Sequence, residues 1–449
     1  MKLSILGGGG FRVPLVFRAL SSGRFAGLIT DVALFDSDPR RLAAMERVLA
    51  SMPVPDSGST PTVSTCADAR TALDGTDMVF AAIRAGSTAG RVLDERIAMK
   101  HGLLGQETTG VGGIAYALRS IPQMLALGRD IADVAPGAWL INFTNPAGMV
   151  TEALQPLLGE RVIGICDSPI SLVRRAALAA GVPLEEGSLS GVDYVGLNHL
   201  GWLRGLTHDG KDHLPALLAD PARLATFEEG RIFGPDLPRM LGCLPNEYLF
   251  YYYFQREATL AMAGARQTRG EFIDVQQRYL YEELLTPGER TPWQLWDAAR
   301  RSREEGYLAE ARTDGEDRDE TDLLGGGYER VALSAMESLL TGKPAELILN
   351  VRNGGLLAQL PADAVVELPS RIDGSGATPL PTTAPTLHQQ GLMSAMKAVE
   401  QLVVRAAVTG DYAAAREAIA IHPLVDSFHS AGAVLAEYQT SHQELAYLR

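Results

Sequence analysis

Residues 3–20 read LSILGGGGFRVPLVFRAL: a short apolar strand, four consecutive glycines and then an apolar helix. Glycines at such a junction let the backbone turn sharply and come close to a pyrophosphate. The N-terminus of the following helix adds unpaired N–H groups and a positive dipole end. The glycines are Gly7, Gly8, Gly9 and Gly10. The pattern predicts a dinucleotide-binding turn at the start of a parallel α/β sheet.

The next apolar strand, residues 31–35, is followed by an acidic residue, Asp36. A carboxylate at this position can hold the ribose hydroxyls of a dinucleotide and would repel a 2′-phosphate, so we expect NAD rather than NADP. The spacing from Gly10 to Asp36 exceeds the usual value of about 20 residues. We therefore expect a longer helix or connecting loop between them.

Short apolar runs alternate with helical stretches through about the first 170 residues, which indicates a parallel sheet covered by helices on both faces. The expected strands are residues 2–6, 31–35, 77–83, 138–143 and 161–165, and the expected helices include residues 40–51 and 121–134.

The rhythm changes after about residue 190. Strands are expected at residues 346–351 and 364–368, helices at 266–311 and 389–408, and irregular structure at 204–242. We therefore predict an α/β fold of two domains. Residues 1–190 would form a Rossmann-like doubly wound NAD-binding domain. Residues 191–449 would form an α+β domain for substrate and metal binding and for oligomerisation, as in the lactate/malate dehydrogenase-like folds.

Composition narrows the class of partner. The 449 residues carry a formal net charge of −14, which would repel nucleic acid and anionic membranes, so we expect neither. No apolar stretch approaches the roughly 20 residues that cross a bilayer.

Three widely spaced cysteines fit a reducing compartment, and we expect a cytoplasmic protein. The acidic run TDGEDRDETD, residues 313–322, is expected to be a solvated or mobile loop.

Two residues far apart in the chain are candidate metal ligands. Cys166 follows directly on an expected buried strand, and His199 lies in a turn rich in Gly and Asn. A thiolate and an imidazole together suit a divalent transition metal. No local ligand spacing connects them, however, so a buried core thiol and a turn histidine remain the alternative.

Five segments together resemble glycoside hydrolase family 4, a group of NAD- and metal-dependent glycosidases of which many act on 6-phosphoglucosides. These enzymes are an exception to the usual two-carboxylate route of glycoside hydrolysis. The segments are IRAGSTAGRVLDERIAMKHGLLGQETTGVGG (83–113), INFTNPAGMVTEAL (141–154), GICDSPI (164–170), VGLNHLGWL (195–203) and LPNEYLFYYY (244–253).

The resemblance implies roles for four residues. Cys166 and His199 would hold Mn²⁺ or another divalent transition metal, with substrate hydroxyls completing a weak site. Tyr248 would be the catalytic base, which requires a nearby cation to lower its pKa; packing within a tyrosine-rich segment is the alternative. Asp167 matches the general acid of the 6-phospho-α-glucosidase branch, and its alternative is a cap on the following helix.

Anion and sugar recognition are assigned to further polar residues. Arg84 is expected to contact the cofactor, while Arg91 and Arg269 are expected to fork onto the substrate phosphate. Each arginine could instead form a surface ion pair. Asn145, at the carboxyl edge of the sheet, and Asn198, in the GLNH motif, are expected to hold sugar hydroxyls near the nicotinamide.

The chemistry that the resemblance implies is oxidation at C3, removal of the C2 proton and elimination of the leaving group, with NAD regenerated. We expect 6-phospho-β-glucosides as substrates, since the segments GQETTG (105–110) and 141–154 resemble that branch. CDSPI and LPNEYL resemble the α branch, and uronides or unphosphorylated glycosides are further alternatives. Two alternatives belong to other functional classes: a 2-hydroxy-acid dehydrogenase and a non-catalytic NAD-sensing module. Family members are usually dimers or tetramers, so a homodimer or homotetramer is expected.

Overall fold

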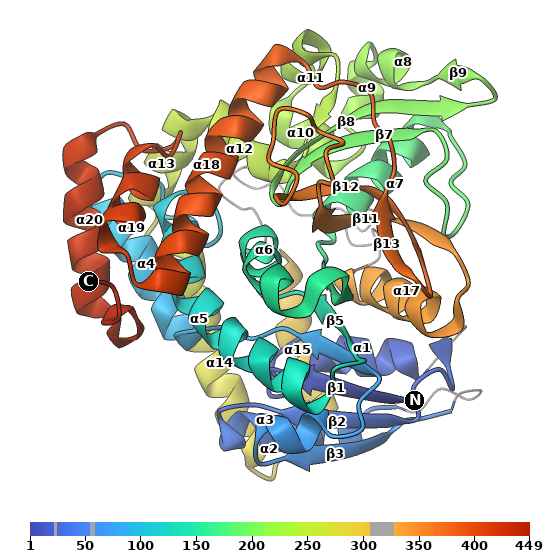
Figure 1. The fold of residues 1–449 in the computed structure, drawn as a ribbon, viewed down its shortest axis with the longest axis vertical. Helices are drawn as coiled ribbons and strands as arrows, with labels where there is room; N and C mark the ends of the chain where they lie inside the picture. The colour runs from blue at the N-terminus through green and yellow to red at the C-terminus, as the bar shows by residue number, and fades with distance from the viewer. Residues whose placement is uncertain (22–24, 54–58, 306–326) are drawn as a thin grey trace.

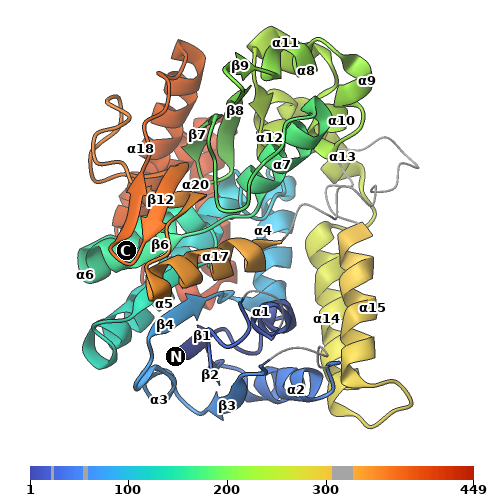
Figure 2. The same ribbon diagram turned by 90° about the vertical axis from the view of Figure 1, so that its right-hand side faces the viewer.

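The computed structural model describes residues 1–21, 25–53, 59–305 and 327–449. In these residues a mixed β-sheet runs through the molecule and carries helices on both of its faces (Figures 1 and 2). The α/β fold class predicted from the sequence is confirmed. The acidic run at 313–322 lies outside the described residues.

The first part of the sheet is parallel, in the order β3-β2-β1-β4-β5-β6, which is the strand order of a doubly wound dinucleotide-binding fold. Its strands are β1 (Lys2–Leu6), β2 (Asp31–Phe35), β3 (Thr62–Cys66), β4 (Met78–Ala81), β5 (Trp139–Asn142) and β6 (Val162–Gly164). Strand β3 was not predicted, because this edge strand is largely exposed and its residues TVSTC form no apolar run.

The sheet then continues in antiparallel fashion. Strand β11 (Ala345–Arg352) pairs with β6 through Asn350 and Gly164, and β12 (Val365–Asp373), β7 (Val192–Leu197) and β8 (Leu200–His208) follow in order. Short strands finish the edges: β9 (Lys211–Asp212), β10 (Leu244–Pro245) and β13 (Gly376–Pro379). The sheet is thus continuous across residue 190, and the two-domain division stays a prediction.

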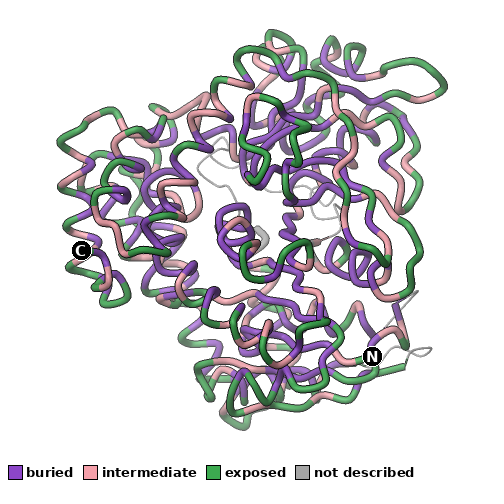
Figure 3. The backbone as a smooth tube through the Cα atoms, viewed as in Figure 1, coloured by how far each residue is buried: buried purple, intermediate pink, exposed green. Residues whose placement is uncertain are grey.

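The two faces of the sheet bury separate apolar cores, as alternation along β4 shows. Met78 and Phe80 belong to one core and Val79 and Ala81 to the other. Figure 3 shows buried residues mainly in the interior of the molecule and exposed residues mainly along its outside. Helices α3 (Ala69–Leu73), α4 (Ser87–Lys100), α5 (Val111–Val134), α6 (Ala147–Leu158), α13 (Gln255–Gly264), α18 (Leu387–Thr409), α19 (Tyr412–Ala420) and α20 (Phe428–Ser441) contribute to one core. Helices α1 (Val13–Leu20), α7 (Ser168–Ala180) and α17 (Tyr328–Thr341) contribute to the other.

A hairpin of two long helices packs on the glycine turn. Helices α14 (Arg269–Leu285) and α15 (Pro292–Glu305) lie beside α2 (Pro39–Ala50) (Figure 2). The Tyr281 hydroxyl donates to the carbonyl of Gly9 at 2.6 Å, and the indole N–H of Trp296 donates to the carbonyl of Phe11 at 2.8 Å. These contacts hold both helices of the hairpin, near the loop that joins them, next to the turn.

The prediction of irregular structure at residues 204–242 is wrong. Strand β8 extends to His208, and four short helices follow it: α8 (Leu214–Leu218), α9 (Pro221–Leu224), α10 (Glu228–Phe233) and α11 (Asp236–Leu241). None is long enough to show a helical period in the sequence. Within the described ranges, no helix has both the length and the apolar composition to span a bilayer.

One buried ion pair between α5 and α4 gives a test of the fold. Arg119 and Asp94 are each 1% exposed, and the Nη1 atom of Arg119 donates to Oδ1 of Asp94 at 2.8 Å. We expect Arg119→Met to lower the free energy of unfolding by about 3–5 kcal/mol, because it leaves a buried carboxylate without its cation. Urea unfolding measures the effect. Arg129→Met, at an exposed position of the same helix, is the control and should stay within about 0.5 kcal/mol of wild type.

Candidate active site

A cleft of about 1620 Å³ lies at the carboxyl ends of the parallel strands, where ligands of open α/β folds bind. Its walls come from the turns after β1, β4, β5 and β6, from the β7–β8 turn, and from the α14–α15 hairpin. The predicted site residues that line it are Gly7, Gly10, Asp36, Arg84, Arg91, Asn145, Cys166, Asp167, His199, Tyr248 and Arg269. Segments far apart in the chain therefore meet in one space.

The glycine turn is closely packed from behind. Gly7 has a φ of +92°, and a Cβ there would lie 2.6 Å from the carbonyl oxygen of Ala82. A Cβ on Gly9 would lie 2.9 Å from Oδ2 of Asp36. Gly8 and Gly9 do not line the cleft themselves; they bring the turn close to β2. Only glycine allows this approach.

Asp36 is connected directly to that turn. Its Oδ2 atom accepts a hydrogen bond from the N–H of Gly9 at 2.9 Å, and Oδ1 accepts one from the N–H of Asp38 at 3.0 Å. Burial raises the pKa of this carboxyl above its usual value. The extra residues in the Gly10–Asp36 spacing belong to the connection between α1 and β2, which confirms the expectation of a longer loop.

Cys166 and Tyr248 are held near one another by a link between their neighbours. Cys166 follows β6, and Tyr248 lies in the 3₁₀ helix η3 (Glu247–Leu249). The hydroxyl of Ser168 donates to Oε1 of Glu247 at 2.9 Å. This buried hydrogen bond joins the end of β6 to the turn that carries the tyrosine.

His199 lies against the ring of Tyr248. The two rings are stacked, with centroids 3.7 Å apart and an angle of 13° between their planes. His199 has a φ of +62° in the tight β7–β8 turn, which presents its ring to the cleft. Burial lowers the pKa of His199 to about 3, so the imidazole is neutral at neutral pH. Its buried Nδ1 atom has no hydrogen-bond partner within the described part of the chain, which leaves Nε2 as the nitrogen that can meet a ligand in the cleft.

The thiol of Cys166 needs a positive charge to ionise. Burial raises its pKa well above the usual value, and the negative charges of Glu367 and Asp167 add to the effect. A divalent cation in the cleft would reverse this balance, as metal ions do for coordinating thiols. The described residues contain no cluster of three or more His, Cys, Asp or Glu side chains arranged to hold a metal. The thiol and the neutral imidazole that line the cleft are donor types that suit a divalent transition metal.

Asp167 stands immediately before α7 but does not cap it. Its side chain accepts no hydrogen bond from the helix N-terminus, and its carboxylate lines the cleft. The alternative of a capping role is therefore wrong. In the tyrosine-rich segment, Tyr251 and Tyr252 belong largely to the core, whereas Tyr248 is half-buried at the cleft.

The arginines of the cleft lie in two different electrostatic environments. Arg84 and Arg91 both pair with Glu107, and Nε of Arg91 also lies 2.7 Å from Oε1 of Glu95. Burial alone would raise the pKa of Glu107, but the two guanidinium groups lower it to about 2. Much of the charge of Arg84 and Arg91 is therefore balanced within the protein.

Arg303, at the end of α15, lies in a more strongly positive environment. Arg269 donates to its carbonyl oxygen, and its guanidinium carbon lies 4.2 Å from the centroid of the Phe11 ring. Burial lowers the pKa of Arg303 well below its usual value, and the charges of Arg12, Arg84, Arg269 and Arg91 lower it further. Among the residues that the structure describes, its buried Nη1 atom has no hydrogen-bond partner. An anion at this place would relieve the repulsion and accept the unused donor.

The two asparagines lie in different settings. Asn145 lines the cleft beside the turn after β5. Asn198 does not; its Oδ1 atom accepts from the N–H of Ala147 at 3.0 Å, and its Nδ2 atom donates to Oε1 of Glu367 at 3.4 Å. Asn198 thus connects the His199 turn to the start of α6, and its predicted sugar contact stays a prediction.

Comparison with known proteins decides the family. Residues 2–181 match the model of family 4 glycosyl hydrolases, and residues 194–425 match the model of the C-terminal domain of the same family. The chain belongs to glycosyl hydrolase family 4. The family predicted from the sequence motifs is confirmed.

Several relatives of this family 4 enzyme are named for a glycosidase activity. A probable 6-phospho-beta-glucosidase of Bacillus subtilis is 33% identical over 85% of this chain and 82% of its own. A 6-phospho-alpha-glucosidase of Leptotrichia buccalis is 27% identical over 97% and 96%. The fold matches the Thermotoga maritima 6-phospho-beta glucosidase, solved with manganese, NAD⁺ and glucose-6-phosphate, with a TM-score of 0.79, 24% identity and full coverage of both chains. It also matches a 6-phospho-alpha-glucosidase from gut microorganisms, solved with NAD and Mn²⁺, with a TM-score of 0.78, 24% identity, and 99% and 98% coverage.

Three residues of the family 4 cleft escaped the sequence analysis. Glu107 lies in the quoted motif GQETTG, and Glu247 directly precedes Tyr248, so the motifs contained both, but nothing in the sequence pairs them with Arg84, Arg91 or Ser168. Arg303 lies in a charged helix among other arginines, and only the fold sets it apart.

The arginine–Glu107 cluster gives a pH-dependent prediction. The pKa of Glu107 is about 2 in the folded chain and has an ordinary value of 4.5, so its ion pairs stabilise the fold fully above pH 4.5 and progressively less as the pH falls toward 2. We expect the stability advantage of wild type over Glu107→Gln to be constant from about pH 8 to about pH 5.5, then to shrink by about 1 kcal/mol by about pH 3.5. Urea unfolding at each pH measures it, and a pH-independent difference would contradict the prediction.

Proposed function

We propose that this chain is an NAD- and Mn²⁺-dependent 6-phosphoglucosidase. The observation that carries the proposal is that Cys166, His199 and Tyr248 line the same cleft as the glycine turn. The relatives and the solved structures that resemble it support the substrate class, since they are named 6-phosphoglucosidases and several were solved with NAD, Mn²⁺ or glucose-6-phosphate.

Each ligand has residues suited to hold it. The glycine turn and the N-terminus of α1 would bind the pyrophosphate of NAD, with Asp36 at the ribose. Cys166 and Nε2 of His199 would hold the metal. When bound, NAD⁺ supplies the hydride acceptor for C3 of the sugar, and the metal ion supplies the positive charge that makes the C2 proton acidic.

Two side chains would carry out the proton transfers. Tyr248, held against His199 by ring stacking, would take the proton from C2. Asp167, whose carboxylate lines the same cleft, would protonate the departing oxygen of the aglycone. The buried Ser168–Glu247 hydrogen bond keeps the two groups in register.

A phosphate on the sugar fits the charge of the cleft. Arg303 has an unused buried donor, and four further arginines are close enough to depress its pKa. A phosphate carries more charge than a carboxylate and more acceptor oxygens than a hydroxyl, so it balances such a cluster better than a uronide or an unphosphorylated sugar.

We propose the β-anomer as substrate. Two relatives named 6-phospho-beta-glucosidases are 33% and 30% identical, compared with 27–29% for several of the α-glucosidases. The 6-phospho-α-glucosidase activity is the second candidate, because Asp167 matches the general acid of that branch and lines the cleft without capping α7.

Isotope labelling tests the reaction directly. With p-nitrophenyl 6-phospho-β-glucoside, NAD⁺ and Mn²⁺ in D₂O, we expect a sugar product with deuterium at C2 and no net NADH. Mass spectrometry and absorbance at 340 nm follow these two quantities. Turnover that survives chelation of the metal and removal of NAD⁺ would refute the proposal. Cleavage of the α-anomer alone would select the second candidate.

The role of Tyr248 is tested by removing one oxygen. Tyr248→Phe should lower kcat by about 10²-fold or more, the usual contribution of a proton-transferring group, while NAD binding stays unchanged. Tyr253→Phe is the matched control, because Tyr253 lies outside the cleft lining and bonds to His388 and Trp202. Equal turnover by wild type and Tyr248→Phe would exclude Tyr248 as the base.

Arg303 is tested by comparing two substrates. Arg303→Gln should raise the KM for the 6-phosphorylated glucoside about tenfold to 100-fold, the value of a lost charge-assisted hydrogen bond, and leave any turnover of the unphosphorylated glucoside unchanged. Arg278→Gln, at an exposed arginine of α14 that pairs with Asp274, is the control. An equal effect on both substrates would assign Arg303 a structural role.

A further inference from the structure

Glu95 is a buried acidic residue that joins two walls of the cleft. It lies on α4, is 1% exposed and stands behind the cleft lining rather than in it. Its Oε1 atom accepts a hydrogen bond from Nε of Arg91 at 2.7 Å, and its Oε2 atom accepts one from the N–H of Gly270 at 2.8 Å. Arg91 lines the cleft, and so does Arg269, which directly precedes Gly270. One carboxylate therefore links the positions of the two arginines that are expected to bind the substrate phosphate.

The contact with α14 is a helix cap that another helix supplies. Gly270 is the second residue of α14, where a backbone N–H has no partner within its own helix. Thr268 and Glu271 satisfy each other's N–H groups in a capping box, and the N–H of Gly270 is left to Glu95. A Cβ on Gly270 would lie 2.6 Å from Oε2 of Glu95, so a larger residue would push the carboxylate away.

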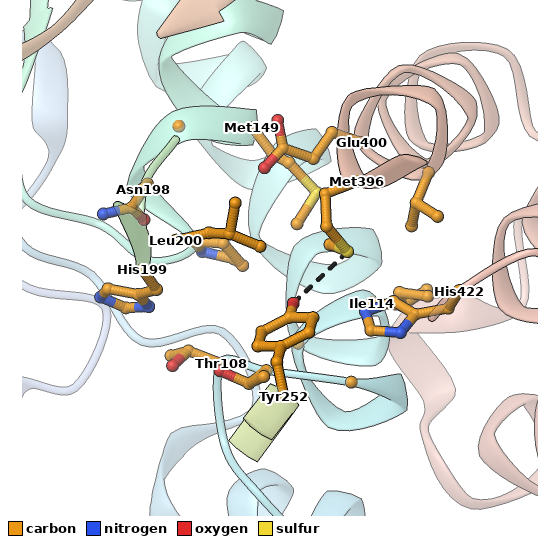
Figure 4. A pocket seen from close by; sticks show the side chains of 16 residues that line it. Thr108, Ile114, Met149, Asn198, His199, Leu200, Tyr252, Met396, Glu400 and His422 are labelled. Atoms are coloured by element: carbon orange, nitrogen blue, oxygen red, sulfur yellow. Dashed lines mark hydrogen bonds between the residues drawn. The ribbon is translucent and has the colours of Figure 1, made fainter. Parts of the chain in front are cut away.

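Arg91 is held from two sides. Glu95 occupies its Nε atom, and its Nη1 atom donates to Oε2 of Glu107 at 2.6 Å. Within the described residues this leaves Nη2 for a ligand, on a side chain that is 12% exposed. Thr108, the residue after Glu107, lines both the cleft and the small pocket beside His199 (Figure 4). Arg91 is thus connected to the segment that reaches the His199 side of the cleft.

The wall that α14 and α15 form carries further positive charge. Arg269 donates to the carbonyl oxygen of Arg303. Burial lowers the pKa of Arg303, and the charges of Arg269 and Arg91 lower it further, so the three guanidinium groups lie near one another. Groups of like charge repel, and fixed supports are needed to keep them at one spacing before an anion arrives.

We propose that Glu95 is a positioning residue that sets the spacing between Arg91 and Arg269 for the phosphate of the substrate. Each of its oxygens holds a donor from a different wall, a guanidinium on α4 and the first turn of α14. The walls are then fixed before the anion binds, and less side-chain freedom is lost on binding. This role rests on the proposed function only for the identity of the anion.

A second link between the same two helices supplies a matched control. The guanidinium of Arg96, one residue after Glu95, donates from Nε and Nη2 to the two carboxylate oxygens of Glu271 at 2.7 and 2.6 Å. The side chain of Arg96 is 45% exposed, and neither residue lines the cleft. Arg96→Gln therefore removes a contact between α4 and α14 and leaves the contacts of Glu95 in place.

Competitive inhibition separates positioning from packing. Glu95→Gln keeps the shape of the side chain but offers one acceptor oxygen instead of two, so it can hold Arg91 or Gly270 but not both. We expect Glu95→Gln to raise the inhibition constant of glucose 6-phosphate about tenfold, as for the loss of one charge-assisted hydrogen bond, and to leave that of glucose unchanged. Gly270→Ala should act in the same direction without a change of charge, because its Cβ displaces Oε2 of Glu95. Arg96→Gln should match wild type for both sugars.

Titration calorimetry with inorganic phosphate makes the same comparison without turnover. The protein is first saturated with NAD, so that phosphate does not enter the glycine turn. Glu95→Gln and Gly270→Ala should each weaken phosphate binding about tenfold, while the dissociation constant for NAD stays at the wild-type value. If Glu95→Gln does not fold, Gly270→Ala carries the test.

The outcomes distinguish this role from the proposed function. Phosphate binding that weakens in Glu95→Gln supports the role, even if wild type cleaves no 6-phosphoglucoside and the proposed function falls. Unchanged phosphate affinity in the folded variant, or no phosphate binding by wild type, would overturn the role even if 6-phosphoglucosides are substrates. An equal loss of affinity for glucose and glucose 6-phosphate would also overturn it, because that result indicates a general loss of packing.

Discussion

The pairing of β11 with β6 is the constraint on which the rest of the site depends. At the contact between Asn350 and Gly164 the parallel sheet passes into the antiparallel one, and β12, β7 and β8 follow. Because Cys166 follows the end of β6 by two residues and the β7–β8 turn carries His199, this one junction sets where a thiol and an imidazole, remote in the chain, can meet. A shift of register there would move the imidazole relative to the carboxyl edge of the sheet.

The cleft is rich in positive charge, although the whole chain carries a net negative charge. The protein has a net charge of −14, yet five arginines gather near one end of the cleft. Glu107 neutralises the two that lie nearest the sheet, and Arg303 is left with an unused donor. A positively charged pocket enclosed by a negatively charged surface favours the binding of a compact, highly charged anion. A long polyanion would also contact the acidic surface around the pocket and be repelled by it.

Local patterns in the sequence were sufficient for five of the six parallel strands, β1, β2, β4, β5 and β6. β1 and β2 begin and end at the expected residues because each is an apolar run bounded by Gly, Asp or polar residues, and the glycine turn follows at once. The polar edge strand β3 and the short helices after β8 carry no such period, so they were missed or described as irregular. The continuity of the sheet across residue 190 is a matter of pairing between distant strands, which no local pattern encodes.

The site was predictable to the extent that motifs carried it. Cys166, Asp167, His199 and Tyr248 were found by resemblance, and the structure brings them into one cleft. What the sequence lacked were the partners: Glu107 for the arginines, Glu247 for Ser168, and the network that holds Asn198 away from the cleft lining. These are contacts between side chains that are brought together only by tertiary structure, and their spacing along the chain has no regularity.

The α14–α15 hairpin has a thermodynamic consequence for the two ligands of this cleft. Tyr281 and Trp296 dock it on the glycine turn, and its open ends carry Arg269 and Arg303. Seating the hairpin therefore prepares the pyrophosphate cradle and the anion pocket at the same time. A ligand that orders this shared element would spare the other ligand the entropic cost of ordering it, and the coupling would be equal in both directions. The cofactor and the phosphorylated sugar would thus each raise the binding affinity of the other through the hairpin, which is itself unchanged by the reaction.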